Sequence, residues 1–156
     1  MPGRIQAEIK QTRPFGSAEA EAFLNLQRTA HALAAGLAAL LKAHHLTRPQ
    51  YNVLRILRGA GEQGLPAGEV VERMITRDPD VTRLIDRLEA RGLVERRRCG
   101  EDRRVVWTRI TPAGLEAVGA LDAPVDALHR RQLGHLGPER LAELIRLLEE
   151  ARTPPG

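Results

Sequence analysis

The sequence is poor in cysteine, serine, lysine and aromatic residues, and these shortages narrow the range of possible functions. A single cysteine, Cys99, excludes an internal disulfide and suits a reducing compartment. With Ser17 as the single serine, the chain has too few nucleophiles for a hydrolase triad. The Gly-rich run "GAGEQG" follows an expected helix, which is the wrong context for a phosphate-binding loop. The sequence therefore predicts a protein that is not an enzyme.

Long apolar runs and clustered metal ligands are also lacking. The longest apolar run, Ala32–Leu41, has ten residues, about half the length that spans a bilayer. The N-terminal run "MPGRIQAEIKQTRPFGS" has no apolar core of the kind that a signal peptide needs. The five histidines do not form a set with ligand spacing. We therefore expect a soluble cytoplasmic protein with no membrane partner, no metal and no cofactor.

Positive charge is concentrated in one quarter of the chain. The formal net charge is +4, and the segment from Arg73 to Arg109 alone holds eleven arginines against seven acidic residues. The rest of the chain is balanced, with thirteen basic and thirteen acidic residues. Localised basicity of this kind is typical of nucleic-acid-binding proteins. The alternative is a solvated arginine-rich face produced by a GC-rich coding bias, which the presence of only two lysines also indicates.

The apolar periodicity and the cap residues predict a mainly helical chain with one β-hairpin. Leu, Ala, Arg and Glu dominate the composition, and all four favour helices. The expected order is a loosely held arm (1–16), a long helix (17–45), a helix from Thr47 to Gly59, a short helix opened by Pro66, a helix from Asp78 to Gly92, strands at "LVERRR" and "RVVWTRI", a fifth helix from Pro112 to about His135, a sixth from Pro138 and a disordered tail (153–156).

The helix after Asp78 has the clearest pattern. Asp78 is expected as the N-cap and Pro79 as the first helical residue, where its missing N–H costs nothing. The apolar residues at i, i+3, i+4 and i+7 spacing predict one buried face, made of Val81, Leu84, Ile85 and Leu88.

A short helix, a turn, an amphipathic helix and two strands make a winged helix-turn-helix. The runs "TRLIDRLEARGLVERR", "EDRR" and "ITPAG", in this order and spacing, resemble the MarR family of bacterial transcription regulators over about residues 20–150. The resemblance implies a mainly α fold with a small β-hairpin wing, and one domain over 17–152 with a DNA-binding core at about 47–111. It also implies a homodimer formed by helices at about 17–45 and 112–152, acting as a repressor on a pseudo-palindromic DNA operator.

In such a protein the helix after Asp78 enters the major groove of double-stranded DNA, where the N-terminal residues of a helix reach base edges. Thr82 and Arg83 lie in its first turns and are the expected base-reading residues. Arg77 and Arg87 are expected at phosphates.

Asp80 is an unusual residue for the end of a helix that approaches DNA, because its carboxylate would repel a phosphate. Either it accepts a hydrogen bond from cytosine N4, or it orients Arg83 or Arg77. A competing interpretation of the same residues is a solvated face on which Arg83 and Arg87 pair with neighbouring carboxylates (Asp80, Asp86 or Glu89).

The run "RRRCGEDRR" places five arginines around one hairpin: Arg96, Arg97, Arg98, Arg103 and Arg104. Because side chains alternate along a strand, these five cannot all face DNA, and some of them must be structural. The resemblance implies that Asp102 braces the turn while Arg103 or Arg104 enters the minor groove, whose negative potential attracts arginine. We count Arg98 among the DNA contacts and interpret Cys99 as an incidental wing residue rather than a redox sensor.

The resemblance further implies a small aromatic or anionic effector in a crevice between the dimer region and the winged domain. The expected lining lies at the junction of the first two helices: His44, His45, Arg48 and Tyr51. The alternative is a hydrated helix end beside a tyrosine at the edge of the core. At the level of function, the alternative is a winged helix that binds RNA or a protein partner.

Overall fold

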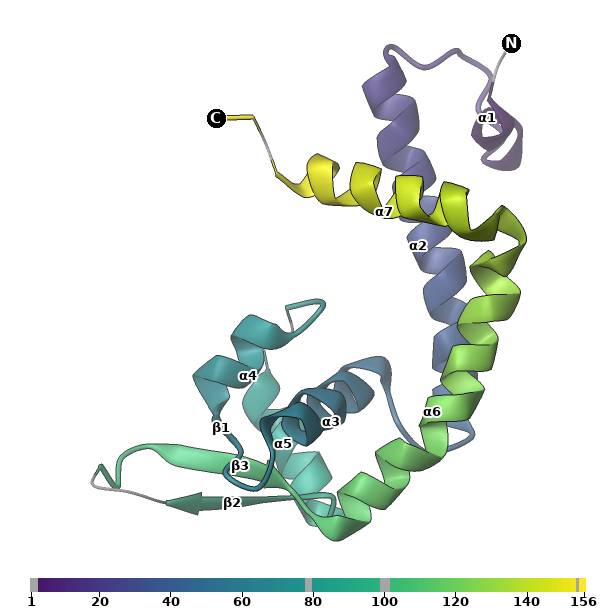
Figure 1. Cartoon of the computed structure of the whole chain (residues 1–156). Coiled ribbons are helices and arrows are strands. Elements are labelled where there is room, and N and C mark those ends of the chain that lie inside the picture. Colours follow the sequence, from purple (N-terminus) through teal and green to yellow (C-terminus); the bar gives the residue numbers. More distant parts are fainter. Residues whose placement is uncertain (1–2, 78–79, 99–101, 154) are drawn as a thin grey trace.

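The computed structural model describes residues 3–77, 80–98, 102–153 and 155–156, and its elements are labelled in Figure 1. The helices are α1 (Arg4–Glu8), α2 (Ala18–Lys42), α3 (Arg48–Ala60), α4 (Ala67–Arg73), α5 (Val81–Ala90), α6 (Pro112–Leu133) and α7 (Gly137–Arg152), and the 3-10 turn η1 (Gly134–Leu136) joins the last two. The strands are β1 (Leu65–Pro66), β2 (Val94–Arg98) and β3 (Val106–Ile110).

Three predicted helix starts are confirmed by their caps. The Ser17 hydroxyl accepts a hydrogen bond from the backbone N–H of Ala20. Thr47 and Gln50 form a reciprocal capping box at the start of α3, which satisfies N–H groups that have no partner within the helix. The Thr111 hydroxyl accepts from the Gly114 N–H and begins α6.

The sheet contains the predicted hairpin and one additional strand. β2 and β3 pair in antiparallel register from Val94 opposite Ile110 to Arg98 opposite Val106. β1 pairs with the other edge of β3, so the strand order is β1-β3-β2. The sequence predicted a short helix opened by Pro66, and Pro66 is the N-cap of α4, but the pairing of Leu65–Pro66 with β3 was not predicted. A two-residue strand has no detectable alternation, and it exists only because β3 offers a free edge.

Close backbone approaches hold the base of the hairpin, where β2 begins and β3 ends. A Cβ atom on Gly114 would lie 2.1 Å from the Leu93 carbonyl oxygen, so only glycine lets α6 start so near β2. The Thr111 hydroxyl donates to the Gly92 carbonyl oxygen at 2.6 Å. This packing gives the "ITPAG" run its physical reason.

The core lies between α3, α5 and the sheet. The four predicted apolar residues of α5 are all buried: Val81, Leu84, Ile85 and Leu88. They belong to the same cluster as Val53, Leu54 and Leu57 of α3, each 0% exposed. Burial of one such side chain is worth about 1.5–3 kcal/mol, so α5 is firmly seated on α3.

A bidentate ion pair joins α3 to α6. Arg58 donates to both carboxylate oxygens of Asp122 at 2.9 and 3.0 Å. These hydrogen bonds lower the pKa of the Asp122 carboxyl below its ordinary value of 3.8, and they raise the pKa of the Arg58 guanidinium. The side chains of Arg58 and Asp122 are 31% and 54% exposed, so solvent screens the pair.

The terminal helices leave much apolar surface uncovered. α6 leads away from the sheet, and α7 turns back from its far end with no buried residue (Figure 1). Ile145 and Leu147 of α7 are 55% and 48% exposed, and Phe23 of α2 is 59% exposed. No described helix is long and apolar enough to cross a membrane.

The N-terminal segment contains α1, whose Ile5 is buried. A loosely held arm was expected over residues 1–16. The division into an arm, a DNA-binding core, dimerisation helices and a tail stays a prediction.

Candidate functional site

Helix α5 is capped by Asp80. Its carboxylate accepts a hydrogen bond from the backbone N–H of Arg83 at 3.1 Å, and α5 begins at Val81. The expectation that Asp78 caps this helix, with Pro79 at its first position, therefore needs correction. An acceptor three residues before its N–H has the usual N-cap geometry, and Asp80 provides it. Asp78 and Pro79 themselves lie outside the described residues.

Asp80 also contacts the side chain of Arg83. Arg83 Nε lies 3.3 Å from Asp80 Oδ2, and the Arg83 side chain remains 69% exposed. Of the roles that the sequence left open for Asp80, this geometry favours the orientation of Arg83. Thr82 is also exposed at the start of the helix. The two expected base-reading residues thus share one solvent-facing turn.

Arg77 and Arg87 are exposed on either side of that turn. Arg87 forms no hydrogen bond or ion pair with a residue in the described ranges. The carboxylates near it on α5, Asp86 and Glu89, are bound by Arg96 of β2 instead. The interpretation in which Arg87 merely pairs with its own helix therefore finds no support here.

Arg96 joins the hairpin to helix α5. Its guanidinium donates to Asp86 Oδ1 at 2.5 Å, to Glu89 Oε1 at 3.3 Å and to the Thr82 carbonyl oxygen at 3.1 Å. Its backbone N–H donates to Glu89 Oε2 at 2.8 Å. With 25% of its side chain exposed, Arg96 is a structural arginine.

Of the two arginines that follow Arg96, one binds another part of the fold and the other is exposed. Arg97 donates to the Glu62 carbonyl oxygen at 3.2 Å, which ties β2 to the loop before β1. Arg98 donates to the Arg103 carbonyl oxygen across the hairpin at 3.2 Å, and its residue is exposed. Arg96 and Arg97 thus serve the fold, as was expected of some of the five arginines.

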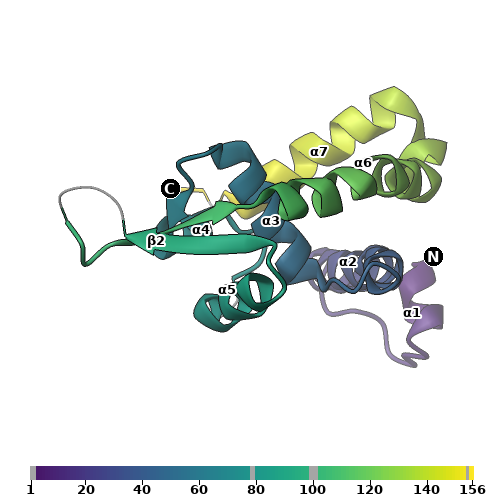
Figure 2. The ribbon, with the colours of Figure 1, turned by 90° about the horizontal axis from the view of Figure 1, so that it is seen from below.

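At the wing tip, Asp102 accepts a hydrogen bond from the Arg104 backbone N–H at 3.0 Å. Arg104 Nε lies 3.9 Å from the same carboxylate, while the Arg104 side chain is 96% exposed. Arg103 is also exposed. In Figure 2 the hairpin reaches beyond the helices and α5 lies next to β2. Cys99 lies outside the described residues.

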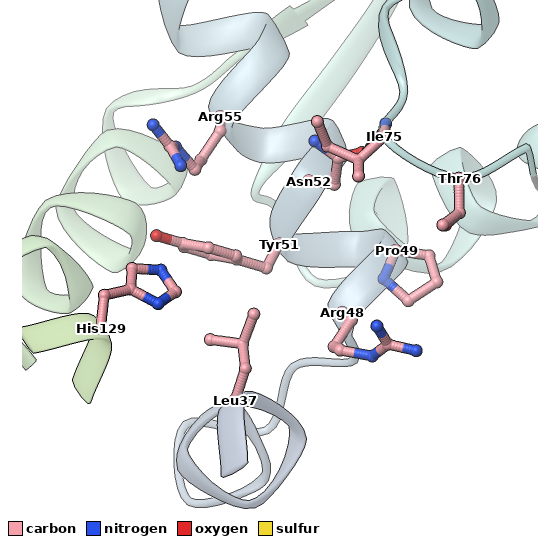
Figure 3. Close-up of a pocket in the computed structure, with 9 residues that line it drawn as sticks. All are labelled: Leu37, Arg48, Pro49, Tyr51, Asn52, Arg55, Ile75, Thr76 and His129. Atoms are coloured by element: carbon pink, nitrogen blue, oxygen red, sulfur yellow. Dashed lines mark hydrogen bonds between the residues drawn. The ribbon is translucent and has the colours of Figure 1, made fainter. Parts of the chain in front are cut away.

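Two of the four residues expected to line the effector site lie in one pocket. A pocket of about 220 Å³ lies between α2, α3, α6 and the turn that precedes α5 (Figure 3). Arg48 and Tyr51 line it, together with residues that the sequence did not indicate: Leu37, Pro49, Asn52, Arg55, Ile75, Thr76 and His129. His44 and His45 do not line it. They are exposed, and the turn after α2 gives His45 a φ of 58°.

The pocket combines an aromatic wall with positive charge. Its lining contains Arg48, Arg55 and His129 and no carboxylate. The Arg55 guanidinium lies 5.9 Å from the centre of the Tyr51 ring. Tyr51 is only 5% exposed, so its ring is held rigidly. Sequence spacing could not have identified His129, because it comes from a helix about eighty positions away.

These features define a winged helix-turn-helix protein with cationic side chains exposed on its recognition helix and wing. A family model for the MarR family matches residues 44–105. The solved structure of a MarR transcription factor from Planctomyces limnophilus is 44% identical, covers 86% of this chain and 98% of its own, and superposes with a TM-score of 0.68. The chain therefore belongs to the MarR family, a family of transcription regulators and not of enzymes.

Two further similarities bear on function. The HTH-type transcriptional regulator TtmR of Methylorubrum extorquens (strain PA1) is 39% identical over 93 residues, which are 60% of this chain and 47% of TtmR. The chain thus spans about half the length of that relative. A structure of Bordetella bronchiseptica BpsR is 25% identical, covers 85% of this chain and 99% of its own with a TM-score of 0.76, and concerns the regulation of BpsR's DNA binding by 6-hydroxynicotinic acid.

Proposed function

We propose that this protein is a ligand-responsive repressor that binds double-stranded DNA as a homodimer on a pseudo-palindromic operator. The observation that carries the proposal is the exposure of Arg83, Arg87 and Arg104 while other arginines of the same segment serve the fold. A regulator of this kind acts in the cytoplasm, where bacterial DNA lies. A compact dimer on a promoter blocks polymerase without further parts, which favours repression.

Base reading is assigned to the first turns of α5. Arg83 can donate two hydrogen bonds to guanine O6 and N7, and Thr82 can use its hydroxyl or its methyl group. Asp80 restricts the Arg83 side chain before DNA arrives, which lowers the entropy lost on binding. Arg77 and Arg87 flank this turn and are assigned to phosphates, which position the helix without reading sequence.

The wing is assigned to the minor groove. Asp102 fixes the backbone at Arg104, so we assign Arg104 to the groove and Arg103 and Arg98 to the adjoining phosphates. A narrow minor groove attracts arginine by its negative potential.

The homodimer is supported by the uncovered apolar surface of α7 and of the N-terminal part of α2. Ile145, Leu147 and Phe23 are each about half exposed, and patches of such side chains mark interaction sites. A two-fold dimer presents its recognition helices about 34 Å apart, one turn of DNA. Ile145→Glu should produce monomers in sedimentation experiments. Leu115→Glu, an exposed apolar residue near the sheet end of α6, is the matched control and should stay dimeric.

The effector is assigned to the pocket around Tyr51. The arginines and His129 favour an anionic group, and the tyrosine ring favours an aromatic one. The regulation of BpsR by an aromatic acid supports this class of ligand. Benzoate and 6-hydroxynicotinic acid should raise the Tm of the protein and weaken DNA binding. Arg48→Ala should abolish both effects, and His44→Ala, outside the pocket, should abolish neither.

The decisive experiment is selection of binding sites from a random duplex library, followed by titration of the selected site at two salt concentrations. The proposal expects a palindromic consensus that resists non-specific competitor. Equal binding to every duplex, or stronger binding to RNA of the same sequence, would instead favour the alternative of an RNA-binding or protein-binding winged helix.

A further inference from the structure

The segment that follows α4 lines the pocket and leads along the chain toward α5. Ile75 and Thr76 line the pocket, and Arg77 follows them immediately. Asp80 caps α5 a few residues later. The turn therefore stands only a few residues before the DNA-reading residues in the chain.

One side chain holds the turn in place. Asn52 Oδ1 of α3 accepts a hydrogen bond from the backbone N–H of Ile75 at 2.9 Å. The two residues lie side by side in Figure 3. The Ile75 side chain is 86% exposed and so contributes little packing. Across 75–77, this is the one hydrogen bond that the turn makes to another described residue.

Asn52 is itself on a rigid base. Its neighbours Tyr51 and Val53 are 5% and 0% exposed, so α3 cannot rotate at this position without disturbing the core. The carboxamide therefore presents a fixed acceptor to a segment that is anchored on its N-terminal side by the buried Met74 and, from Ile75 to Arg77, has this one side-chain hydrogen bond to another described residue. Its Nδ2 has no hydrogen-bond acceptor among the described residues, although Asn52 lines the pocket.

We propose that Asn52 is a positioning residue for DNA recognition, which fixes the start of α5 through Ile75 and ties it to the wall of the pocket. The inference rests on the proposed function, because it assumes that α5 reads DNA. Asn52 does not touch a base. Its Oδ1 holds the turn, and its Nδ2 remains able to donate to an oxygen atom of a pocket occupant, so one side chain connects occupancy to the recognition helix.

The test uses the full chain and three variants. Asn52→Ala removes the acceptor, and because alanine is a better helix former than asparagine, it does not weaken α3. Asn52→Asp keeps an acceptor oxygen at the same place. Gln63→Ala is the control, since Gln63 also carries a side-chain amide, is exposed in the loop before β1, lies outside the pocket and forms no side-chain hydrogen bond with a described residue.

Two measurements are made on each protein: hydrogen–deuterium exchange of the peptide that contains Ile75–Arg77, and affinity for a selected operator and for a random-sequence duplex. Asn52→Ala should exchange faster and bind the operator about five- to tenfold more weakly, the factor that one hydrogen bond is worth. Its affinity for the random duplex should fall less, because the loss concerns base reading. Asn52→Asp and Gln63→Ala should behave as the wild type.

Unchanged exchange or unchanged operator affinity in Asn52→Ala would overturn the inference, and so would an Asn52→Asp variant as weak as Asn52→Ala. A wild-type protein without sequence preference would refute the proposed function instead. The exchange measurement would then still decide whether Asn52 holds the turn.

Discussion

Replacement of Arg96 tests whether this arginine supports the fold rather than DNA contact. Arg96→Ala removes three guanidinium hydrogen bonds, to Asp86, Glu89 and the Thr82 carbonyl. The Arg96 side chain is 25% exposed, while the two carboxylates are 56% and 40% exposed. Partial exposure reduces each bond to roughly 0.5–1 kcal/mol. The free energy of unfolding should therefore fall by about 2 kcal/mol.

Urea unfolding followed by the fluorescence of Trp107 is the appropriate assay, because Trp107 is the single tryptophan and lies on β3 of the wing. Arg96→Lys keeps the charge but loses the planar fork, so it should recover about half of the lost stability. Arg87→Ala is the matched control on the exposed face of α5, and its stability should stay within about 0.5 kcal/mol of the wild type.

For DNA affinity the order of the two variants should be reversed, with the larger loss in Arg87→Ala and the smaller loss in Arg96→Ala. Arg87→Ala should weaken binding to any duplex while the protein stays as stable as before. An Arg96→Ala protein that unfolds at the wild-type urea concentration would refute the bracing role. Equal destabilisation by Arg87→Ala would refute the distinction between the two arginines.

Three further predictions concern DNA reading and the joint between α3 and α6. Arg83→Ala should weaken the binding free energy for the selected operator by about 1–3 kcal/mol and relax the base preference at one position. An equal loss of affinity on every sequence would exclude base reading. Arg104→Ala should reduce the magnitude of the slope of log K against log salt concentration by about 1, and an unchanged slope would show that Arg104 does not approach the DNA backbone. The folded-state pKa of Asp122 is lowered by its bonds to Arg58, so its contribution to stability is complete above the ordinary value of 3.8 and is lost as the pH falls toward the folded-state pKa. Asp122→Asn should therefore flatten the acid limb of the stability curve, and an acid limb that matches the wild type would show that the Arg58 pair does not contribute to it.

Much of the fold was predictable because local signals repeat. The i, i+3, i+4 stripe of α5 and the caps at Ser17, Thr47 and Thr111 are all confirmed. Each of these depends on residues within about two helical turns, so spacing alone carries the information. The hairpin was predictable for the same reason, while β1 was not, because it depends on pairing with a strand some forty positions away.

The candidate site divides in the same way. The sequence located the basic segment and the exposed start of α5, since charge density and helix periodicity can be read directly. It could not assign the individual arginines. Arg96 and Arg97 serve the fold because of what faces them across the structure, namely the carboxylates of α5 and the Glu62 carbonyl. The N-cap of α5 is Asp80 and not the expected Asp78, because the Asp80 carboxylate accepts the hydrogen bond from the Arg83 backbone N–H three residues later.

By itself, then, the sequence determined the kind of fold, the place of helix α5 and the location of the excess charge, because these properties depend on near neighbours along the chain. Only the tertiary structure decided which arginines bind distant parts of the fold, how His129 joins Tyr51 in one pocket, and how Asn52 reaches Ile75. These relations join residues that are distant in the chain, and their partners are set by the packing of helices against one another.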